Sequence, residues 1–192
     1  MGAGAVSGGE ADKLQRLNRL LDLLFAVTDG CYMAGLLEEV LGGDITYSQM
    51  RCLLYICRNN SDGEEKIRIT DVAENLGVSL PAATKVVNRL AAKDLLRKKK
   101  DFRDARNTIL TLTPLGIEYC SRYAERRMQK LKEVTADLSA EELDGFLDWA
   151  TKFLLLNLRK LERRQLQRFC QHCGYEHDES CPLYKLCHDL QP

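Results

Sequence analysis

Two short helical patterns joined by a tight turn, with a charged hairpin pattern directly after them, constrain the fold of this chain most. The first pattern, DVAENL, follows Thr70, which we expect to cap it, and ends at Gly77, which can supply a positive-φ turn residue. The second, LPAATKVVNRLAAK, follows the cap residue Ser79 and has Pro81 in its first turn, where a missing N–H does no harm. This spacing predicts a helix-turn-helix, whose second helix enters the DNA major groove.

The hairpin pattern after these helices is strongly basic. The run LLRKKKDFRDARNTILTLT predicts two β-segments, 95–99 and 107–112, joined by a charged turn. Its basic residues are Arg97, Lys98, Lys99, Lys100, Arg103 and Arg106. On a protruding hairpin such cations can contact phosphates or enter the minor groove. Because the formal net charge of the chain is zero, the electrostatic case for DNA binding rests on this local surface.

Helical patterns also precede the helix-turn-helix. Apolar residues recur at three- and four-residue steps over 11–25, and GLLEEVLGGD is a short helix that two glycines stop. Thr46 and Gln49 form a capping box for the next helix, whereas Ile67 and Ile69 alternate with charged residues and suggest a short strand.

Two long helices are expected after the hairpin. Thr113 and Pro114 supply a cap and a first-turn proline for a helix that reaches about residue 138. Ser139 and Glu142 form a second capping box, which opens a helix through about residue 168. The order of elements therefore favours a mainly α fold with one small β-hairpin.

The predicted helix-turn-helix and hairpin together resemble a known family. The run ITDVAENLGVSLPAATKVVNRLAAKDLLRKKKDFRDARNTILTLTPLG resembles the winged helix-turn-helix of the MarR family (multiple antibiotic resistance regulators). The family's D-x-R-D-x-R wing pattern matches Asp101, Arg103, Asp104 and Arg106, and its L-T-x-x-G strand exit matches Leu112, Thr113 and Gly116. The resemblance extends more loosely over residues 11–165. Asp94 stands where the family usually has Gly, and Asp tolerates that turn conformation.

The resemblance implies an obligate homodimer whose N- and C-terminal helices interlock. Two winged modules would then reach successive major grooves of a pseudo-palindromic operator in double-stranded DNA. The family's wing arginine corresponds to Arg106, which Asp104 would orient by ion pairing. The residues expected to contact DNA are Ser79, Ala83, Thr84, Lys85, Asn88, Arg89, Lys98, Lys99, Arg103 and Arg106, with Asp101 and Asp104 supporting the wing. Val86, Val87 and Leu90 are expected to hold the second helix to the core.

A cysteine-rich segment, CQHCGYEHDESCPLYKLC, follows the last helical pattern. Its four thiols, Cys170, Cys173, Cys181 and Cys187, have the spacing C-x2-C-x7-C-x5-C, which can surround one metal centre. The first half resembles a zinc-ribbon knuckle. The second half, CPLYKLC, resembles the last iron–sulfur ligand segment of helix-hairpin-helix DNA glycosylases, and Pro after a ligand Cys is common in [4Fe–4S] loops. We therefore expect a [4Fe–4S] cluster, with zinc or a ligandless tail as alternatives.

Three histidines and four further cysteines have less specific interpretations. His172, His177 and His188 lie among the tail cysteines, and any of them can replace a thiolate in a zinc site. Cys31, Cys52, Cys57 and Cys120 fall within helical patterns and are expected to be small buried hydrophobes, with a redox-sensing thiol as the alternative.

The sequence thus predicts a winged helix-turn-helix with a helical dimerisation domain formed by the N- and C-terminal helices. The expected parts are a disordered lead 1–10, N-terminal dimerisation helices 11–45, the winged module 46–113, C-terminal dimerisation helices 114–168 and a metal-binding tail 169–192. No secretory signal or membrane-length apolar run is present in the sequence, so a cytoplasmic protein without a membrane partner is expected.

The expected function is transcription regulation, as a repressor whose cluster senses redox state, oxygen or nitric oxide. The alternative is a regulator of ordinary family type that responds to a small aromatic ligand and has a structural zinc tail. We expect no enzyme, because the sequence offers no nucleophile–base pair, Gly-rich phosphate loop or carboxylate–His constellation.

Overall fold

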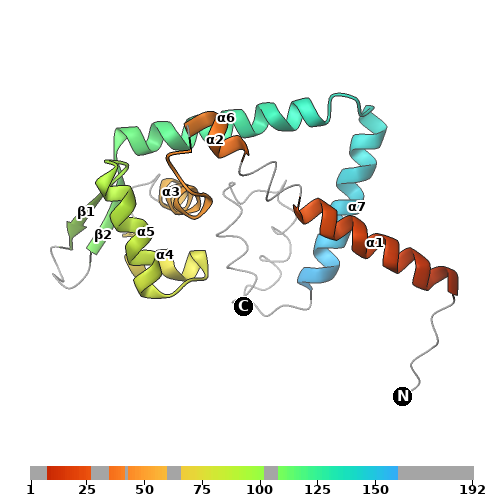
Figure 1. Cartoon of the computed structure of the whole chain (residues 1–192), viewed down its shortest axis with the longest axis horizontal. Coiled ribbons are helices and arrows are strands. Elements are labelled where there is room, and N and C mark those ends of the chain that lie inside the picture. The colour runs from red at the N-terminus through yellow and green to blue at the C-terminus, as the bar shows by residue number, and fades with distance from the viewer. Residues whose placement is uncertain (1–7, 27–34, 42, 60–65, 102–107, 160–192) are drawn as a thin grey trace, which may run out of the picture. The chain divides into compact units, whose positions relative to one another are not determined.

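The computed structural model describes residues 8–26, 35–41, 43–59, 66–101 and 108–159 (Figure 1). The chain divides into two compact units, 1–47 and 48–192. In the first unit, α1 (Gly8–Ala26) begins three residues before the expected start at residue 11, within the expected lead. The short helix α2 (Gly35–Leu41) ends just before Gly43, whose φ of 73° is the left-handed value that stops a helix.

The helix-turn-helix follows α3 (Tyr47–Asn59) and consists of α4 (Ile69–Leu76) and α5 (Leu80–Ala92). The expected cap at Thr70 is wrong, because α4 begins two residues earlier than expected and Arg68 is its N-cap. The carboxylate of Asp71 accepts the backbone N–H of Arg68 at 2.7 Å and so satisfies one unpaired donor of this helix end. Gly77 ends α4 with a φ of 68°, which confirms its predicted turn role.

The start of α5 is confirmed as well. The Ser79 hydroxyl accepts the backbone N–H of Ala82 at 3.4 Å, and Pro81 lies in the first turn. One stripe of α5, formed by Ala83, Val87 and Leu90, is fully buried.

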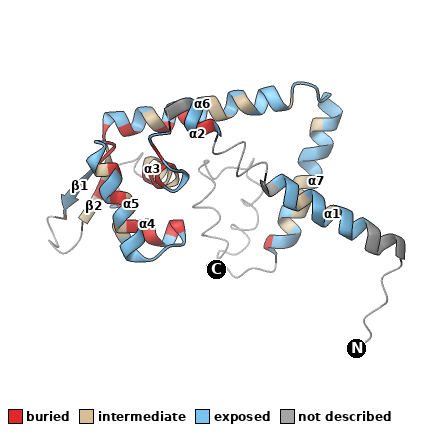
Figure 2. Ribbon diagram, viewed as in Figure 1, coloured by how far each residue is buried: buried red, intermediate tan, exposed pale blue. Residues whose placement is uncertain are grey.

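The core of the winged module collects apolar side chains from three helices and the hairpin. Figure 2 shows the buried residues concentrated in α3, α4 and α5. The fully or nearly fully buried side chains include Met50, Leu53, Ile56, Val72, Val87, Leu90, Leu95, Leu96 and Leu110. Burying one such side chain stabilises the fold by roughly 1.5–3 kcal/mol relative to leaving it in water.

The wing is a two-stranded antiparallel hairpin of β1 (Leu96–Lys100) and β2 (Thr108–Leu112), whose register pairs Leu96 with Leu112 and Lys100 with Thr108. The strand β1 begins one residue later than predicted, whereas residue 107, the predicted start of β2, lies outside the described residues. The short strand expected at Ile67 and Ile69 is reduced to one bridge between Arg68 and Ile109, because Ile69 already belongs to α4.

A cluster of buried hydrogen bonds joins the end of the wing to α6 (Pro114–Val134). The Thr113 hydroxyl donates to the Asp94 carbonyl at 2.6 Å and accepts the Gly116 N–H at 3.0 Å. Asp94 has a φ of 54°, which confirms that it takes the turn conformation expected for this position. Gly116 lies directly against Leu95, because a Cβ added to it would overlap the Leu95 carbonyl oxygen.

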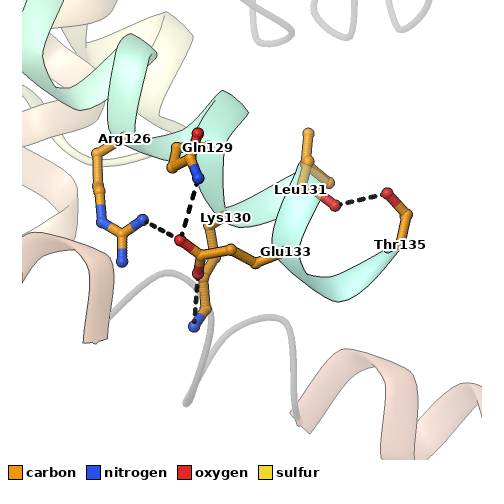
Figure 3. A network of polar contacts seen from close by, with 6 residues as sticks. All are labelled: Arg126, Gln129, Lys130, Leu131, Glu133 and Thr135. Carbon is orange, nitrogen blue, oxygen red and sulfur yellow. Dashed lines mark hydrogen bonds and ion pairs between the residues drawn. The ribbon is translucent and has the colours of Figure 1, made fainter. Parts of the chain in front are cut away.

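Beyond the winged module, α6 ends in a network around Glu133 (Figure 3). An acidic residue in a last turn opposes the helix dipole. Here Arg126 donates to Glu133 at 2.8 Å, Gln129 donates at 3.4 Å and Lys130 pairs at 3.5 Å. The Arg126 hydrogen bond is the main reason that the pKa of Glu133 lies below its ordinary value. The helix ends at Val134, earlier than the expected residue 138.

The last described helix, α7 (Ala140–Leu158), starts with the predicted capping box. Ser139 accepts the Glu142 N–H at 3.2 Å, and the Glu142 carboxylate accepts the Ser139 N–H at 2.9 Å. All of α7 is described, and within it only Leu158 is buried. The predicted continuation to about residue 168 lies outside the described residues.

Candidate nucleic-acid interface

The exposed face of α5 carries most of the residues that the sequence places at a DNA surface. Lys85, Asn88 and Arg89 are exposed, Thr84 is half-buried, and Ser79 is exposed at the helix start. This face lies opposite the buried stripe, so the same packing that holds α5 to the core presents its polar side outward.

Ala83 requires a correction. It was expected to face DNA, but its side chain is fully buried. Ala83 lies four residues before Val87 and seven before Leu90, and therefore shares their side of the helix. A small apolar residue near the helix start is compatible with either face by sequence, and packing assigns it to the core. Leu80, in contrast, is 49% exposed and offers an apolar surface suited to a thymine methyl group.

Local hydrogen bonds restrict what two hydroxyl groups on α5 can offer to DNA. Ser79 uses its oxygen as the cap acceptor for Ala82, which leaves its O–H available to donate. Thr84 donates to the Leu80 carbonyl at 2.8 Å, so its hydroxyl offers lone pairs outward. At the start of this helix Ser79 is therefore suited to phosphate oxygens, and Thr84 to a donor group on a base edge.

One hydrogen bond connects α5 to the wing. Lys98 Nζ in β1 donates to Asn88 Oδ1 at 2.8 Å. Because an ammonium group only donates, this contact fixes the orientation of the amide and leaves the NH₂ group of Asn88 facing outward. Asn88 can then donate to acceptors on a base edge, but it cannot form the paired donor–acceptor contact that recognises adenine while Lys98 holds its oxygen.

The basic residues of β1 project to both faces of the hairpin. Successive side chains of a strand alternate, so Lys98 and Lys100 share one face while Arg97 and Lys99 share the other. Since Lys98 contacts Asn88, the first pair lies on the face directed toward α5. All four are exposed. Lys98 and Lys99 are both expected to contact DNA, but they lie on opposite faces of the hairpin and therefore cannot make equivalent contacts. Substituting each lysine separately can distinguish the two contacts.

The base of the wing is held by an ion pair. Asp101 is 5% exposed and accepts Lys66 Nζ at 3.0 and 3.1 Å through its two oxygens, while Lys66 itself is 41% exposed. The support of the wing by Asp101 stays a prediction, and the ion pair with Lys66 is the contact that would provide it. Lys66 was not identified from the sequence, because its partner lies 35 residues away and no local pattern connects them.

Several predicted site residues lie outside the described residues. These are Arg103, Asp104 and Arg106 of the wing turn, the tail cysteines Cys170, Cys173, Cys181 and Cys187, and Cys31. Within the described part of the chain, no group of three or more His, Cys, Asp or Glu side chains is arranged to hold a metal ion. In the same residues, no helix is long and apolar enough to cross a membrane.

The fold and this surface together define a winged helix-turn-helix protein. Residues 43–107 match the family model described as MarR family. Over 93 residues the chain is 31% identical to the transcriptional regulator AdcR of Streptococcus pyogenes serotype M6. That alignment covers 47% of this chain and 63% of the regulator, so the chain spans less than two thirds of this curated relative.

Solved structures agree on the fold. The YusO protein of Bacillus subtilis has a TM-score of 0.61 at 23% identity, covering 75% of this chain and 96% of that one. A point mutant of MepR from S. aureus, bound to an oligodeoxyribonucleotide, has a TM-score of 0.56 at 23% identity, with coverage of 72% and 95%. The fold is therefore MarR-like, which confirms the predicted mainly α architecture with a two-stranded wing.

Proposed function

We propose that this chain is a sequence-specific, double-stranded DNA-binding transcription regulator of MarR type. The hydrogen bond between Asn88 and Lys98 carries the proposal, because it brings the exposed face of α5 and the basic strand β1 to one side of the winged module. The helix start would enter the major groove, where Asn88 and Leu80 meet base edges. Lys99 and the other exposed cations would contact phosphates. The relative bound to an oligodeoxyribonucleotide supports this use of the fold.

We propose further that the regulator works as a homodimer on a pseudo-palindromic operator. Large apolar side chains are exposed along α6 and α7, and soluble monomers rarely leave such surfaces uncovered. The exposed residues include Ile117, Met128, Leu131, Phe146, Leu147, Trp149, Leu154 and Leu156, and the rings of Trp149 and Phe153 stack at 5.3 Å. A second copy of the chain would bury these faces and present two winged modules to successive major grooves. Sedimentation should give a dimer, and a monomer at micromolar concentration would contradict this arrangement.

DNA binding is tested by selection from a random-sequence duplex library, followed by titration of the selected and scrambled duplexes at several salt concentrations. Selection of one enriched, two-fold symmetric sequence is expected. Failure to enrich any sequence would refute specific recognition.

Lys98→Ala and Lys99→Ala form the informative pair of variants. Each removes one cation, so each should reduce the salt slope of binding by about 0.9 where that lysine contacts a phosphate. Only Lys98→Ala also releases the oxygen of Asn88, so only this variant should change base preference at one position of each half-site. Lys132→Ala, at an exposed lysine of α6, is the matched control and should leave binding unchanged. If Lys98→Ala kept the wild-type base preference, the proposed role of the Asn88 amide would be wrong.

We also propose that the tail cysteines hold a [4Fe–4S] cluster that senses redox state, oxygen or nitric oxide and makes repression respond to it. The support is the sequence spacing and the C-P-L-x-x-x-C segment alone. Metal and sulfide analysis of anaerobically purified protein tests it, with iron and sulfide in equal amounts as the expected result. Zinc without sulfide would replace the cluster by a structural zinc site. If Ala at all four cysteines left DNA affinity and stability unchanged, the tail would have no regulatory role.

A further inference from the structure

The short segment in front of α4 pairs with the wing through its backbone. The carbonyl of Ile67 accepts the backbone N–H of Leu110 in β2 at 2.8 Å, and Arg68 forms a β-bridge with Ile109. Antiparallel pairing of this kind holds two chains side by side. Strand β2 therefore has a neighbour along each edge, with β1 on one side and residues 67 and 68 on the other.

The same segment leads directly into the helix-turn-helix. Ile69 is the first residue of α4, and Arg68 is the N-cap of that helix. Because the Asp71 carboxylate accepts the Arg68 N–H, the residue that pairs with β2 is also fixed to the first turn of α4. On the other edge of the hairpin, Lys98 of β1 donates to Asn88 of α5. The wing is thus connected to both helices that would meet DNA.

The ion pair between Lys66 and Asp101 completes these connections at the end of β1. Asp101 directly follows Lys100, the last residue of β1, and Lys66 directly precedes the segment that pairs with β2. The ammonium group of Lys66 contacts both carboxylate oxygens of Asp101. Because this carboxylate is almost completely buried, losing the partner cation costs more than it would for a pair in water.

We propose that Lys66 is a positioning residue for DNA binding, because its ion pair with Asp101 fixes the wing relative to α5. With the wing fixed, the exposed lysines of β1 can reach phosphates while the start of α5 lies in the major groove. This inference rests on the proposed DNA-binding function. It adds a residue that controls DNA affinity through another side chain, without contacting DNA itself.

Neutralising the two partners separately distinguishes positioning from direct attraction to DNA. If Lys66 contacted a phosphate, Lys66→Ala would weaken binding, whereas Asp101→Asn would strengthen it by removing a negative charge. If the ion pair positions the wing, both variants should weaken binding. The loss of one phosphate contact corresponds to roughly a tenfold rise in Kd at about 0.1 M salt, so each variant should show at least that. The double variant should bind no more weakly than either single variant, because both substitutions break the same contact.

The binding test uses the full-length protein and the duplex enriched by the selection described above. Titration gives Kd, and hydroxyl-radical footprinting maps the protected sugars. Both single variants should lose the protection due to the wing and keep that of the major-groove site, whereas a general loss of folded protein would weaken the whole footprint evenly. Lys66→Arg keeps the charge and should restore the wing footprint. Glu74→Gln neutralises an exposed carboxylate of α4, and as the matched charge control it should not weaken binding.

Hydrogen exchange in the absence of DNA tests the wing directly. In Lys66→Ala and Asp101→Asn, the Leu110 N–H that donates to Ile67 should exchange several-fold faster, while the amides of α5 keep their wild-type rates. Unchanged exchange in β2, or tighter DNA binding by Asp101→Asn, would overturn the proposal. If the wild-type protein enriched no duplex, the DNA-binding function would fail, and exchange would still decide whether the ion pair holds the wing.

Discussion

Gly116 packs its first-turn backbone in α6 against the start of the wing, and Ala at this position should destabilise the protein. An ideal Cβ would overlap the Leu95 carbonyl oxygen and lie 3.1 Å from the carbonyl carbon and 3.5 Å from Leu112 Cδ2. The overlapping atom belongs to the backbone, so no side-chain rotation can relieve the contact. Either α6 or the residue that leads into β1 must move.

Two effects of this substitution oppose each other. Ala gains about 1 kcal/mol over Gly from helix propensity. Overpacking costs roughly 1–3 kcal/mol. Moving Leu95 also weakens the hydrogen bond that its carbonyl accepts from the Thr113 N–H at 3.2 Å, at a further cost of about 0.5–1.5 kcal/mol. The net expectation is a loss of about 2 kcal/mol in the free energy of unfolding, so steric overlap outweighs propensity.

Urea unfolding at a fixed protein concentration measures this loss, with Gly145→Ala in α7 as the matched control. Gly145 has no atom within 4 Å of its ideal Cβ, so this variant should gain up to about 1 kcal/mol. The two Ala variants should therefore differ by about 3 kcal/mol. If Gly116→Ala were as stable as the wild type, the close approach of α6 to the wing would not exist in solution.

Further substitutions test the polar contacts. Thr113→Val keeps the shape of a side chain that is 2% exposed but removes both of its hydrogen bonds. The free energy of unfolding, measured in urea, should fall by about 2 kcal/mol. An unchanged urea midpoint would rule out the buried cap. Asp101→Asn removes the charge that pairs with Lys66 and should lower the free energy of unfolding by about 1–2 kcal/mol. Lys66→Ala should also destabilise the protein, and its loss should be smaller at high salt than at low salt because salt screens the ion pair. The backbone N–H of Ser139 lowers the pKa of Glu142, so this carboxylate stabilises α7 above its ordinary pKa of 4.5 and loses that effect as the pH falls through its lowered pKa. Circular dichroism should show Glu142→Gln less helical than the wild type at neutral pH and equal to it in acid.

The sequence was sufficient wherever the deciding interaction is local. The cap hydrogen bonds of Ser79, Thr113 and Ser139 join residues three apart, and the turns at Gly77 and Asp94 depend on the φ preference of one residue. These positions set the order and the approximate bounds of the helices. The failure at Thr70 has the same origin, because Asp71 is an equally good local acceptor and places the start of α4 two residues earlier.

What the sequence determined by itself is the winged helix-turn-helix class, since helix caps, turn residues and the alternating pattern of a hairpin act within a few residues. Tertiary packing decided the rest. It turned Ala83 into the core, joined Lys98 to Asn88, and paired Lys66 with Asp101 across 35 residues. These contacts depend on where separate elements meet in space, and no pattern within either element encodes its distant partner.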